Sequence, residues 1–393
     1  MTEDVSRYLP EDGCAGTLVA RVWVPAEAGP AVALVTGDGV FDLSRSFPTV
    51  ARLLDEPDPA IAVRTAVRGV RLGSVAELFA NSVAATRDPT RPWLLAPIDL
   101  QAVKAAGVTF ASSLLERVVE EQARGDPGRA EATRRALVEE IGSDLGAVRP
   151  GSPAAERLKA SLIKRGLWSQ YLEVGIGPDA EVFTKCQPLA SVGFGADIGI
   201  HPGSSWNNPE PEIVVAVNSR GALVGATLGN DVNLRDVEGR SALLLSKAKD
   251  NNGSCAIGPL LRLLDASFTL DDIRGADLDM RVEGDDGFVM TGHSSMRMIS
   301  RDVLDVVGQT IGAHHQYPDG FVLFMGTMFA PTDDRGAPGQ GFTHKVGDVV
   351  MISTPKLGAL VNRVDHSDRI APWRFGVRAL MENLAARRLL EKN

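Results

Sequence analysis

Two glutamates stand two residues apart at the start of an apolar run. Glu210 and Glu212 lead into Val214–Val217, a β-branched stretch typical of a buried strand. Alternate residues of a strand point to the same face, so we expect both carboxylates on one face. Side by side they repel, and each raises the pKa of the other unless a cation lies between them.

A third carboxylate follows one predicted hairpin later. A turn at Ser219–Gly221 is expected to lead into an antiparallel strand that returns Asp231 to the Glu210–Glu212 end. Three carboxylates with open positions suit a hard cation, namely Mg²⁺, with Mn²⁺ or Ca²⁺ as alternatives. The alternative without chemistry is a solvated acidic strand start, which the glutamate pair taken alone favours.

Further short motifs stand in order around these carboxylates. They are Phe183-Thr-Lys185, Glu210-Pro-Glu212, Asp231 with Arg235-Asp236, Lys247-Ala-Lys249-Asp250, Ile257-Gly-Pro259, Gly326-Thr327 and Val346-Gly-Asp348. Their order and spacing over residues 98–393 resemble the fumarylacetoacetate hydrolase superfamily. The resemblance is closest to its branch of 2-keto-3-deoxy-pentonate (xylonate or arabinonate) dehydratases.

The resemblance implies three groups of site residues. The first group would bind the metal, the second would be catalytic, and the third would bind the substrate. They are Glu210, Glu212 and Asp231 for the metal; Lys249, Glu116 and Arg235 for catalysis; and Lys185, Thr327, Gly326 and Ser113 for the substrate.

The segment before the motifs departs from the family's hydrolases. In those enzymes a histidine and a glutamate three residues apart activate water on a mobile lid helix. Gly107–Glu116 aligns with that pattern without a gap, which places Ser113 at the histidine position and Glu116 at the glutamate position. The hydrolytic base is therefore missing. Lys249–Gly253 (Lys-Asp-Asn-Asn-Gly) also departs from the hydrolases and resembles the dehydratase branch.

These departures favour elimination of water over hydrolysis of a C–C bond. The implied reaction converts 2-keto-3-deoxy-D-xylonate or L-arabinonate to 2-oxoglutarate semialdehyde through a Mg²⁺-stabilised enolate. Lys249 or Glu116 would move the proton, and Arg235 or Lys185 would assist the departing hydroxyl. Two alternatives remain open. One is an acylpyruvate hydrolase of the same superfamily that uses Glu116, and the other is a non-catalytic cation-binding protein.

The sequence predicts two domains in a mainly β fold with a helical insertion, an α+β class. Residues 1–97 are expected to form a small β-rich N-terminal domain, and residues 98–393 a mixed-β catalytic domain of fumarylacetoacetate hydrolase type. A helical lid is expected over about 112–170. Within the N-terminal domain, strands are predicted at 16–24, 30–35 and 40–43, and helices at 50–54 and 75–81.

Helix signals are clearest in the lid. Helices are predicted over 129–141 and 153–165, the second with Ser152 as its cap. Ser112 or Ser113 is expected to cap an earlier helix that begins near Leu114. Ser300 is likewise expected to cap a helix over 300–309.

The composition excludes several classes of protein. The net charge is −9, and Lys and Arg are spread throughout, which argues against nucleic acid or an anionic membrane as a partner. Cys14, Cys186 and Cys255 show no metal or disulfide spacing and fit a reducing compartment. There is neither a signal-peptide pattern nor an apolar run approaching the ~20 residues of a membrane helix. We expect a cytoplasmic enzyme for a small 2-oxo acid, and the resemblance implies a homodimer or homotetramer.

Overall fold

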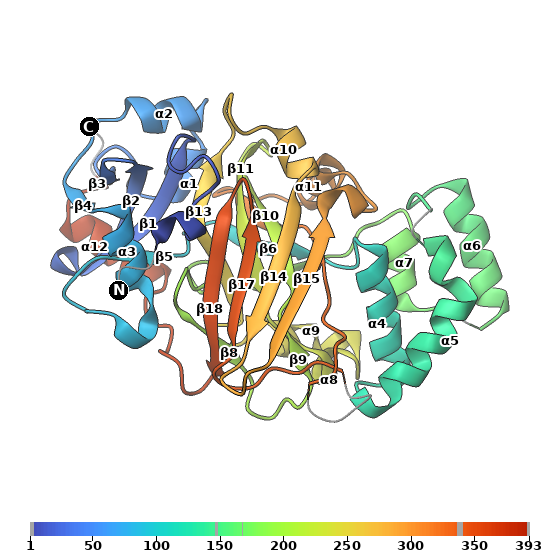
Figure 1. Ribbon diagram of the computed structural model, residues 1–393. Coiled ribbons are helices and arrows are strands. Elements are labelled where there is room, and N and C mark those ends of the chain that lie inside the picture. Colours follow the sequence, from blue (N-terminus) through green and yellow to red (C-terminus); the bar gives the residue numbers. More distant parts are fainter. Residues whose placement is uncertain (1–3, 146–147, 167, 336–340, 391–393) are drawn as a thin grey trace.

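Two facing β-sheets form the body of the protein (Figure 1). Their strands are β1 Leu18–Val24, β2 Gly29–Thr36, β3 Gly39–Asp42, β4 Arg71–Gly73, β5 Trp93–Leu95, β6 Ala102–Ala106, β7 Val182–Cys186, β8 Asp197–Ile200, β10 Pro211–Val217, β11 Leu223–Asp231, β13 Cys255–Leu263, β14 Asp277–Glu283, β15 Val289–Ser295, β16 Phe321–Phe324, β17 Val349–Thr354 and β18 Gly358–His366. The larger sheet has the order β4-β3-β2-β1-β13-β11-β10-β16-β6-β7, with β5 also on β1, and the smaller has β15-β14-β17-β18-β8. This computed structural model describes residues 4–145, 148–166, 168–335 and 341–390.

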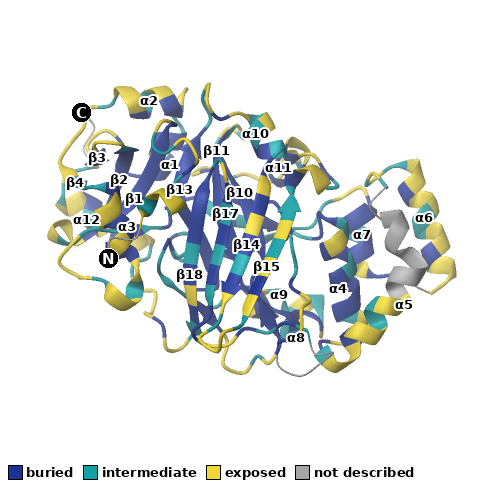
Figure 2. Cartoon of the chain, viewed as in Figure 1, coloured by how far each residue is buried: buried dark blue, intermediate teal, exposed yellow. Residues whose placement is uncertain are grey.

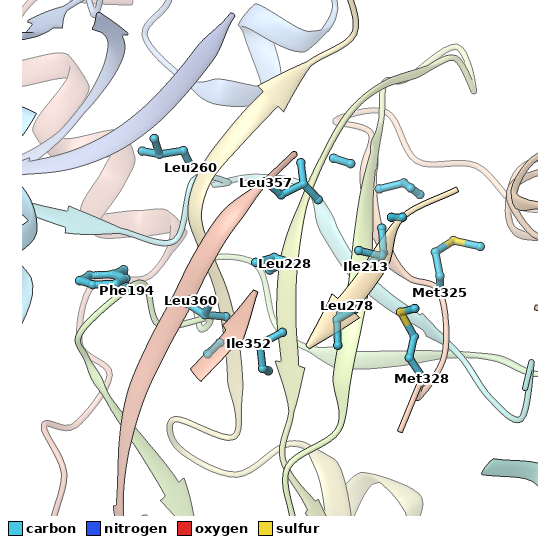
Figure 3. Packing of buried hydrophobic residues seen from close by; sticks show 14 of the residues in the cluster. Phe194, Ile213, Leu228, Leu260, Leu278, Met325, Met328, Ile352, Leu357 and Leu360 are labelled. Atoms are coloured by element: carbon cyan, nitrogen blue, oxygen red, sulfur yellow. The ribbon is translucent and has the colours of Figure 1, made fainter. Parts of the chain in front are cut away.

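Apolar side chains that alternate along the strands fill the space between the two sheets (Figure 3). Ile213 of β10 and Leu228 of β11 pack there against Leu278 of β14. Val214 belongs to a separate buried cluster and so faces the other side of the larger sheet. Glu212 is in step with Val214, which fixes the side on which its carboxylate leaves the sheet.

The N-terminal strands continue the larger sheet. Strand β1 pairs with β13 through Leu18↔Arg262 and Val19↔Leu261. The predicted strands at 16–24, 30–35 and 40–43 are β1, β2 and β3, and the two predicted helices are α1 (Val50–Leu54) and α3 (Val75–Ser82). The sequence did not indicate α2 (Pro59–Thr65). A domain boundary at residue 97 stays a prediction.

Four helices stand beside the sheets (Figure 1). They are α4 Ala111–Ala123, α5 Pro127–Leu145, α6 Pro153–Lys164 and α7 Gln170–Ile176. Figure 2 shows a buried inner face on α4 and an exposed outer helix α6. Val118 and Val119 of α4 pack with Leu162 and Leu172. The helices predicted over 129–141 and 153–165 are confirmed, and Ser152 caps the second as expected. We call α4–α7 the lid.

Short elements complete the fold. They are α8 Arg235–Glu238, α9 Leu245–Lys249, α10 Leu270–Arg274, α11 Val303–Thr310, α12 Val377–Ala386 and a two-stranded pair of β9 Asn207–Asn208 with β12 Asn233–Leu234. Helix α12 packs Leu380 and Leu384 against Leu189. In the described part of the chain, no helix is long and apolar enough to cross a membrane. The combination of mixed sheets and helices confirms the predicted α+β class.

Two predicted helix caps are wrong. Helix α4 begins at Ala111, and its N-cap is Phe110, which has no side chain able to cap. Ser113 therefore lies in the first turn, where its hydroxyl donates to the Phe110 carbonyl at 2.9 Å. The cap of α11 is Asp302, because its carboxylate accepts a backbone N–H of the first turn, whereas Ser300 lies outside the helix.

Candidate metal centre and active site

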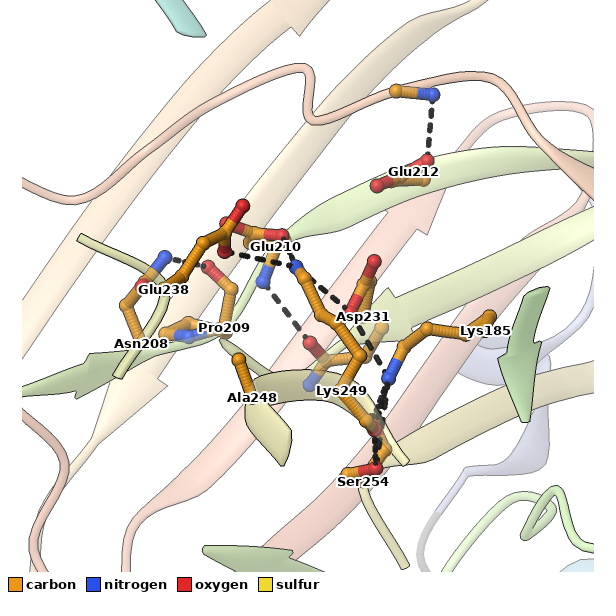
Figure 4. Close-up of polar contacts among 12 residues, drawn as sticks. Lys185, Asn208, Pro209, Glu210, Glu212, Asp231, Glu238, Ala248, Lys249 and Ser254 are labelled. Atoms are coloured by element: carbon orange, nitrogen blue, oxygen red, sulfur yellow. Dashed lines mark hydrogen bonds and ion pairs between the residues drawn. The ribbon is translucent and has the colours of Figure 1, made fainter. Parts of the chain in front are cut away.

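Three carboxylates meet where β10 begins and β11 ends (Figure 4). The antiparallel register pairs Glu212 with Gly229, and the Asp231 N–H donates to the Glu210 carbonyl at 2.9 Å. One ligand oxygen from each of Glu210, Glu212 and Asp231 lies within 4.8 Å of the others. Each of these residues is only 1 % exposed. The predicted hairpin and the predicted convergence of the three carboxylates are confirmed. We call them the carboxylate cluster.

Two buried lysines contact this cluster. Lys249 Nζ lies 2.6 Å from Glu210 Oε2 and 3.1 Å from Asp231 Oδ1. Lys185 Nζ lies 3.1 Å from Asp231 Oδ1 and donates to the Lys249 and Ser254 carbonyls at 2.8 and 3.1 Å. Figure 4 shows both ammonium groups pointing to Asp231. Lys185 comes from β7 and Lys249 from the end of α9, so these elements meet at the cluster.

The carboxylates differ in the charge that their surroundings favour. Burial disfavours the charge of Glu210, but Arg117 and Lys249 outweigh it and lower the pKa to about 2. Burial raises the pKa of Glu212 far above its usual range, and the charges of Asp231 and Glu210 add to the effect. Bringing a divalent cation among these oxygens would remove that repulsion. The buried, all-oxygen donor set therefore fits a hard cation such as Mg²⁺.

The charge on Lys249 is strongly stabilised. Burial disfavours the ammonium form, yet Asp231, Glu210 and Glu238 outweigh burial and raise the pKa of Lys249. A cation shared with the same carboxylates would act in the opposite direction. Glu238 lies 3.8 Å from Lys249 Nζ, and burial raises its own pKa to about 7.

The lid reaches the cluster through α4. Arg117 forms a buried ion pair between its Nη2 and Glu210 Oε1, and its Nη1 lies 2.6 Å from Glu120 Oε2 and 3.4 Å from Glu238 Oε2. Arg117, Glu120 and Glu238 were not among the site residues predicted from the sequence. A signal for Glu120 was present, because it lies four residues after Glu116 on the same helix face, and Arg117 lies three residues before Glu120.

Arg235 is held by the same lid helix. Its Nε lies 2.6 Å from Glu120 Oε1, and its Nη2 lies 2.8 Å from Glu116 Oε2. The guanidinium also stacks 4.4 Å above the Trp206 ring. Arg134 of α5 forms a second pair with Glu116 at 2.6 Å. Burial would raise the pKa of Glu116, but its two arginines outweigh burial and lower it.

The Gly326–Thr327 turn lies against Glu212. The Gly326 N–H donates to Glu212 Oε2 at 2.6 Å. Gly326 has φ +103°, and a Cβ there would lie 1.9 Å from Thr109 Oγ1, so only glycine fits without displacement. Thr327 is 7 % exposed, so this turn lines the buried side of the site.

Glu181, which the sequence analysis passed over, also lies near the cluster. Its carboxylate rests over Gly107, where a Cβ would lie 1.8 Å from Glu181 Oε2. Among the described residues its carboxylate has no hydrogen-bond or ion-pair partner. Burial raises its pKa against the nearby charges of Arg117 and Lys249. Glu181 is thus a half-buried acid near the site whose carboxylate is not paired with any other charge among the described residues.

One segment of the chain matches a known protein family. Residues 176–365 match the family described as "Fumarylacetoacetate (FAA) hydrolase C-terminal". This domain belongs to the fumarylacetoacetate hydrolase family. The matched range holds β10, β11 and α9, and hence all three carboxylates and Lys249. The resemblance inferred from the motifs is confirmed.

Two curated relatives align with about half of this chain. A "2-dehydro-3-deoxy-D-arabinonate dehydratase" of Saccharolobus solfataricus is 28% identical over 193 residues, which is 48% of this chain and 60% of the relative. A "Probable 2-keto-3-deoxyxylonate dehydratase" of Haloferax volcanii is 30% identical over 194 residues, 49% of this chain and 63% of the relative. The chain therefore spans less than two thirds of each relative.

Solved structures share the fold over a longer stretch. The structure of "2-keto-3-deoxy-D-arabinonate dehydratase complexed with magnesium and 2,5-dioxopentanoate" has a TM-score of 0.60 and 20% identity, and the match covers 89% of this chain and 99% of that one. A fumarylacetoacetate hydrolase from Exiguobacterium antarcticum has a TM-score of 0.54 and 15% identity, with 89% and 99% covered. At these identities the likeness establishes the fold.

Most of the site residues named from the sequence come together in the fumarylacetoacetate hydrolase domain and its lid. The carboxylate cluster meets Lys185 and Lys249 directly, and Gly326 contacts the cluster through Glu212. Glu116 and Arg235 form a neighbouring layer paired with each other. Ser113 is turned back to its own helix. The assigned roles stay predictions.

Proposed function

We propose that this chain is a hydro-lyase that removes water from a 2-keto-3-deoxy sugar acid. The substrate we favour is 2-keto-3-deoxy-D-xylonate or L-arabinonate, with 2-oxoglutarate semialdehyde as the product. The observation that carries the proposal is the buried carboxylate cluster with Lys249 and Lys185 against it. The names of the two curated relatives support the same reaction class.

The proposed metal ligands are Glu210, Glu212 and Asp231, and the proposed metal is Mg²⁺, with Mn²⁺ or Ca²⁺ as alternatives. When bound, such a cation stabilises negative charge on the 2-oxo group as a C3 proton leaves. The chain's own lysines add positive charge on the same side, because Lys249 and Lys185 both lie 3.1 Å from Asp231 Oδ1.

Two residues are proposed to move protons, and their surroundings differ. Lys249 lies against the cluster, where a bound cation would disfavour its ammonium form. The neutral amine would then accept the C3 proton from the substrate. Glu116 is ionised and doubly paired, which suits it to holding Arg235 as much as to proton transfer. Glu181 is a third candidate, since its raised pKa and lack of a partner suit it to protonating the departing hydroxyl.

The remaining proposed residues hold the substrate. The Gly326–Thr327 turn is proposed to receive the carboxylate of the 2-oxo acid. Lys185 and Arg235 are proposed to assist the C4 hydroxyl, and Ser113 to line the lid side. A missing lid histidine is the feature that favours elimination over acylpyruvate hydrolysis. Ser113 does not supply a base in its place, because its hydroxyl is donated to the Phe110 carbonyl.

A cytoplasmic location and a homodimer or homotetramer belong to the proposal as well. The location follows from Cys14, Cys186 and Cys255, whose spacing fits a reducing compartment, and the oligomer follows from the family resemblance. Size-exclusion chromatography with light scattering would establish the oligomer.

The decisive experiment is product analysis with 2-keto-3-deoxy-pentonate and Mg²⁺, with and without chelator. We expect a product lighter by one water, lost on chelation and in Glu212→Gln. Pyruvate released from an acylpyruvate, with no turnover of the sugar acid, would instead support the hydrolase. Metal binding with turnover of neither substrate would support the non-catalytic alternative.

A further inference from the structure

The lid is fastened directly to one of the metal ligands. Arg117 of α4 pairs with Glu210 Oε1 through Nη2, and its Nη1 contacts Glu120 of the same helix and Glu238 of α8. Arg117 is 8 % exposed, so this contact is shielded from water and salt. The guanidinium therefore joins the lid, the body and the carboxylate cluster at one point.

Glu210 is the ligand that two cations of the chain already share. Its Oε1 faces Arg117, and its Oε2 lies 2.6 Å from Lys249 Nζ. Among the described residues, the other two ligands contact no lid side chain: Glu212 accepts the Gly326 N–H, and Asp231 pairs with lysines of the body. A metal ion entering the cluster must therefore share Glu210 with Arg117, and two cations so close to each other repel.

The lid has a second attachment that avoids the metal ligands. Glu116 and Glu120 of α4 both pair with Arg235, at 2.8 and 2.6 Å. Arg235 and the three carboxylates are each 1 % exposed, and α4 contacts both Arg235 and Glu210, so movement of α4 would help to expose the site to a substrate. One anchor of α4 thus depends on the cluster, and the other does not.

We propose that Arg117 is a positioning residue that couples the lid to the metal, holding α4 on Glu210 until a divalent cation takes over that carboxylate. Metal loading then weakens one of the two anchors and lets substrate enter, while the Arg235 anchor keeps the lid near its closed position. The inference rests on the proposed function for its view of the cluster as a metal site. Coupling between sites is reciprocal. If a bound metal weakens the contact between α4 and Glu210, then that contact weakens metal binding by the same factor.

The test combines metal affinity with lid mobility in the full chain. Mn²⁺ is titrated into chelator-treated wild type, Arg117→Met and Arg134→Met by calorimetry, and hydrogen exchange is followed in peptides covering α4. Arg134→Met is the matched control, because Arg134 is also a lid arginine paired with two carboxylates but does not touch Glu210. Arg117→Lys keeps the positive charge but loses the two-pronged guanidinium. It serves as a second variant if Arg117→Met misfolds, which thermal melting would reveal.

We expect Mn²⁺ to speed exchange in α4 of the wild type. Arg117→Met should exchange fast without metal and bind Mn²⁺ at least about fivefold more tightly, the low end of ordinary coupling between sites. Arg134→Met should bind Mn²⁺ as the wild type does, and Arg117→Lys should fall between the two. Two results would overturn the inference. One is unchanged or weaker Mn²⁺ binding in Arg117→Met, and the other is a hydrogen-exchange rate in wild-type α4 that does not change when Mn²⁺ is added.

These outcomes are separable from failure of the proposed function. If wild type shows the Mn²⁺ response but does not dehydrate the sugar acid, the coupling stands and the reaction is wrong. If it dehydrates the acid with metal but α4 does not respond, the reaction stands and the coupling is wrong.

Discussion

Two of the buried charge clusters in the described part of the chain differ in how fully their charges are compensated. In the carboxylate cluster, the pKa of Glu212 is raised by burial and by its acidic neighbours. In the second cluster, Asp348 pairs with Arg335 and accepts the Lys345 N–H at 3.0 Å, and it lies 3.1 Å from His344 Nδ1. Burial there is outweighed by those partners, so the pKa of Asp348 is lowered. We call Arg335, His344 and Asp348 the Arg335 cluster.

The difference separates a structural cluster from a candidate site. In the Arg335 cluster the carboxylate of Asp348 is paired within the chain by Arg335 and His344, although Arg335 Nε, His344 Nε2 and Asp348 Oδ1 have no hydrogen-bond partner among the described residues. Glu212 has the Gly326 N–H as its donor among the described residues and repels two carboxylates, so its neighbourhood is completed by an added cation. Burial alone does not mark a functional site; incomplete compensation does.

The largest effect is expected from breaking the balanced cluster. Arg335→Met leaves the buried Asp348 without its main partner, which should lower the free energy of unfolding by about 3–5 kcal/mol. Urea unfolding followed by circular dichroism measures it. A loss below about 1 kcal/mol would mean that the Arg335 cluster is not structural.

Glu212→Gln should have the opposite effect, a large loss of activity without a loss of stability. We expect dehydration to fall by more than about 100-fold, because loss of a ligand should exceed the effect of losing a group that merely supports one. The chelated variant should be at least as stable as wild type, since burial disfavours the charge of Glu212. Turnover and melting temperature of the same preparation check both. A destabilisation as large as that of Arg335→Met would contradict the comparison.

The two clusters should give opposite pH dependence of stability. Glu238, beside the carboxylate cluster, has a pKa raised from 4.5 to about 7, so the folded chelated protein binds its proton more tightly than the unfolded chain does. Its contribution to stability should therefore be present at low pH and be lost as pH rises from about 4.5 to about 7. The free energy of unfolding of Glu238→Gln and of wild type, measured in chelator across this pH window, gives the contribution of Glu238. If the two free energies change with pH in parallel, Glu238 makes no such contribution.

A smaller effect of opposite sign is expected at His344. Burial lowers its pKa from 6.5, against the pull of Asp348, so the unfolded chain takes up the proton first. Its contribution to stability should be present above pH 6.5 and be lost as pH falls below it. His344→Gln should flatten that loss in acid unfolding curves. If wild type and variant lose stability equally between pH 6.5 and 5, the histidine is not held neutral by the fold.

Local patterns predicted much of the site. The two-residue spacing of Glu210 and Glu212 and a hairpin signal were enough to bring Asp231 to them, because a strand has a fixed period and a short turn fixes its partner. Local chemistry also predicted α6 through Ser152 and Pro153. The start of α4 was missed because Phe110 begins that helix without a side-chain cap, so no capping residue marked the position.

Long-range contacts were beyond these patterns. The pairing of Arg117 with Glu210 joins residues 93 positions apart, and that of Arg235 with Glu120 joins residues 115 positions apart. Glu181 is not part of a recognisable sequence motif. Only the folded structure shows that it lies over Gly107 and near the carboxylate cluster.

By itself, the sequence determined the strand period, helices α5 and α6 of the lid and the donor set, because each depends on residues close together in the chain. The tertiary structure alone decided which charges are compensated. Compensation depends on burial and on distances of a few ångströms between distant segments, since a charge pair gains or loses most of its energy over that range in a medium that excludes water. Whether a carboxylate supports the fold or awaits a cation is therefore a property of the folded chain.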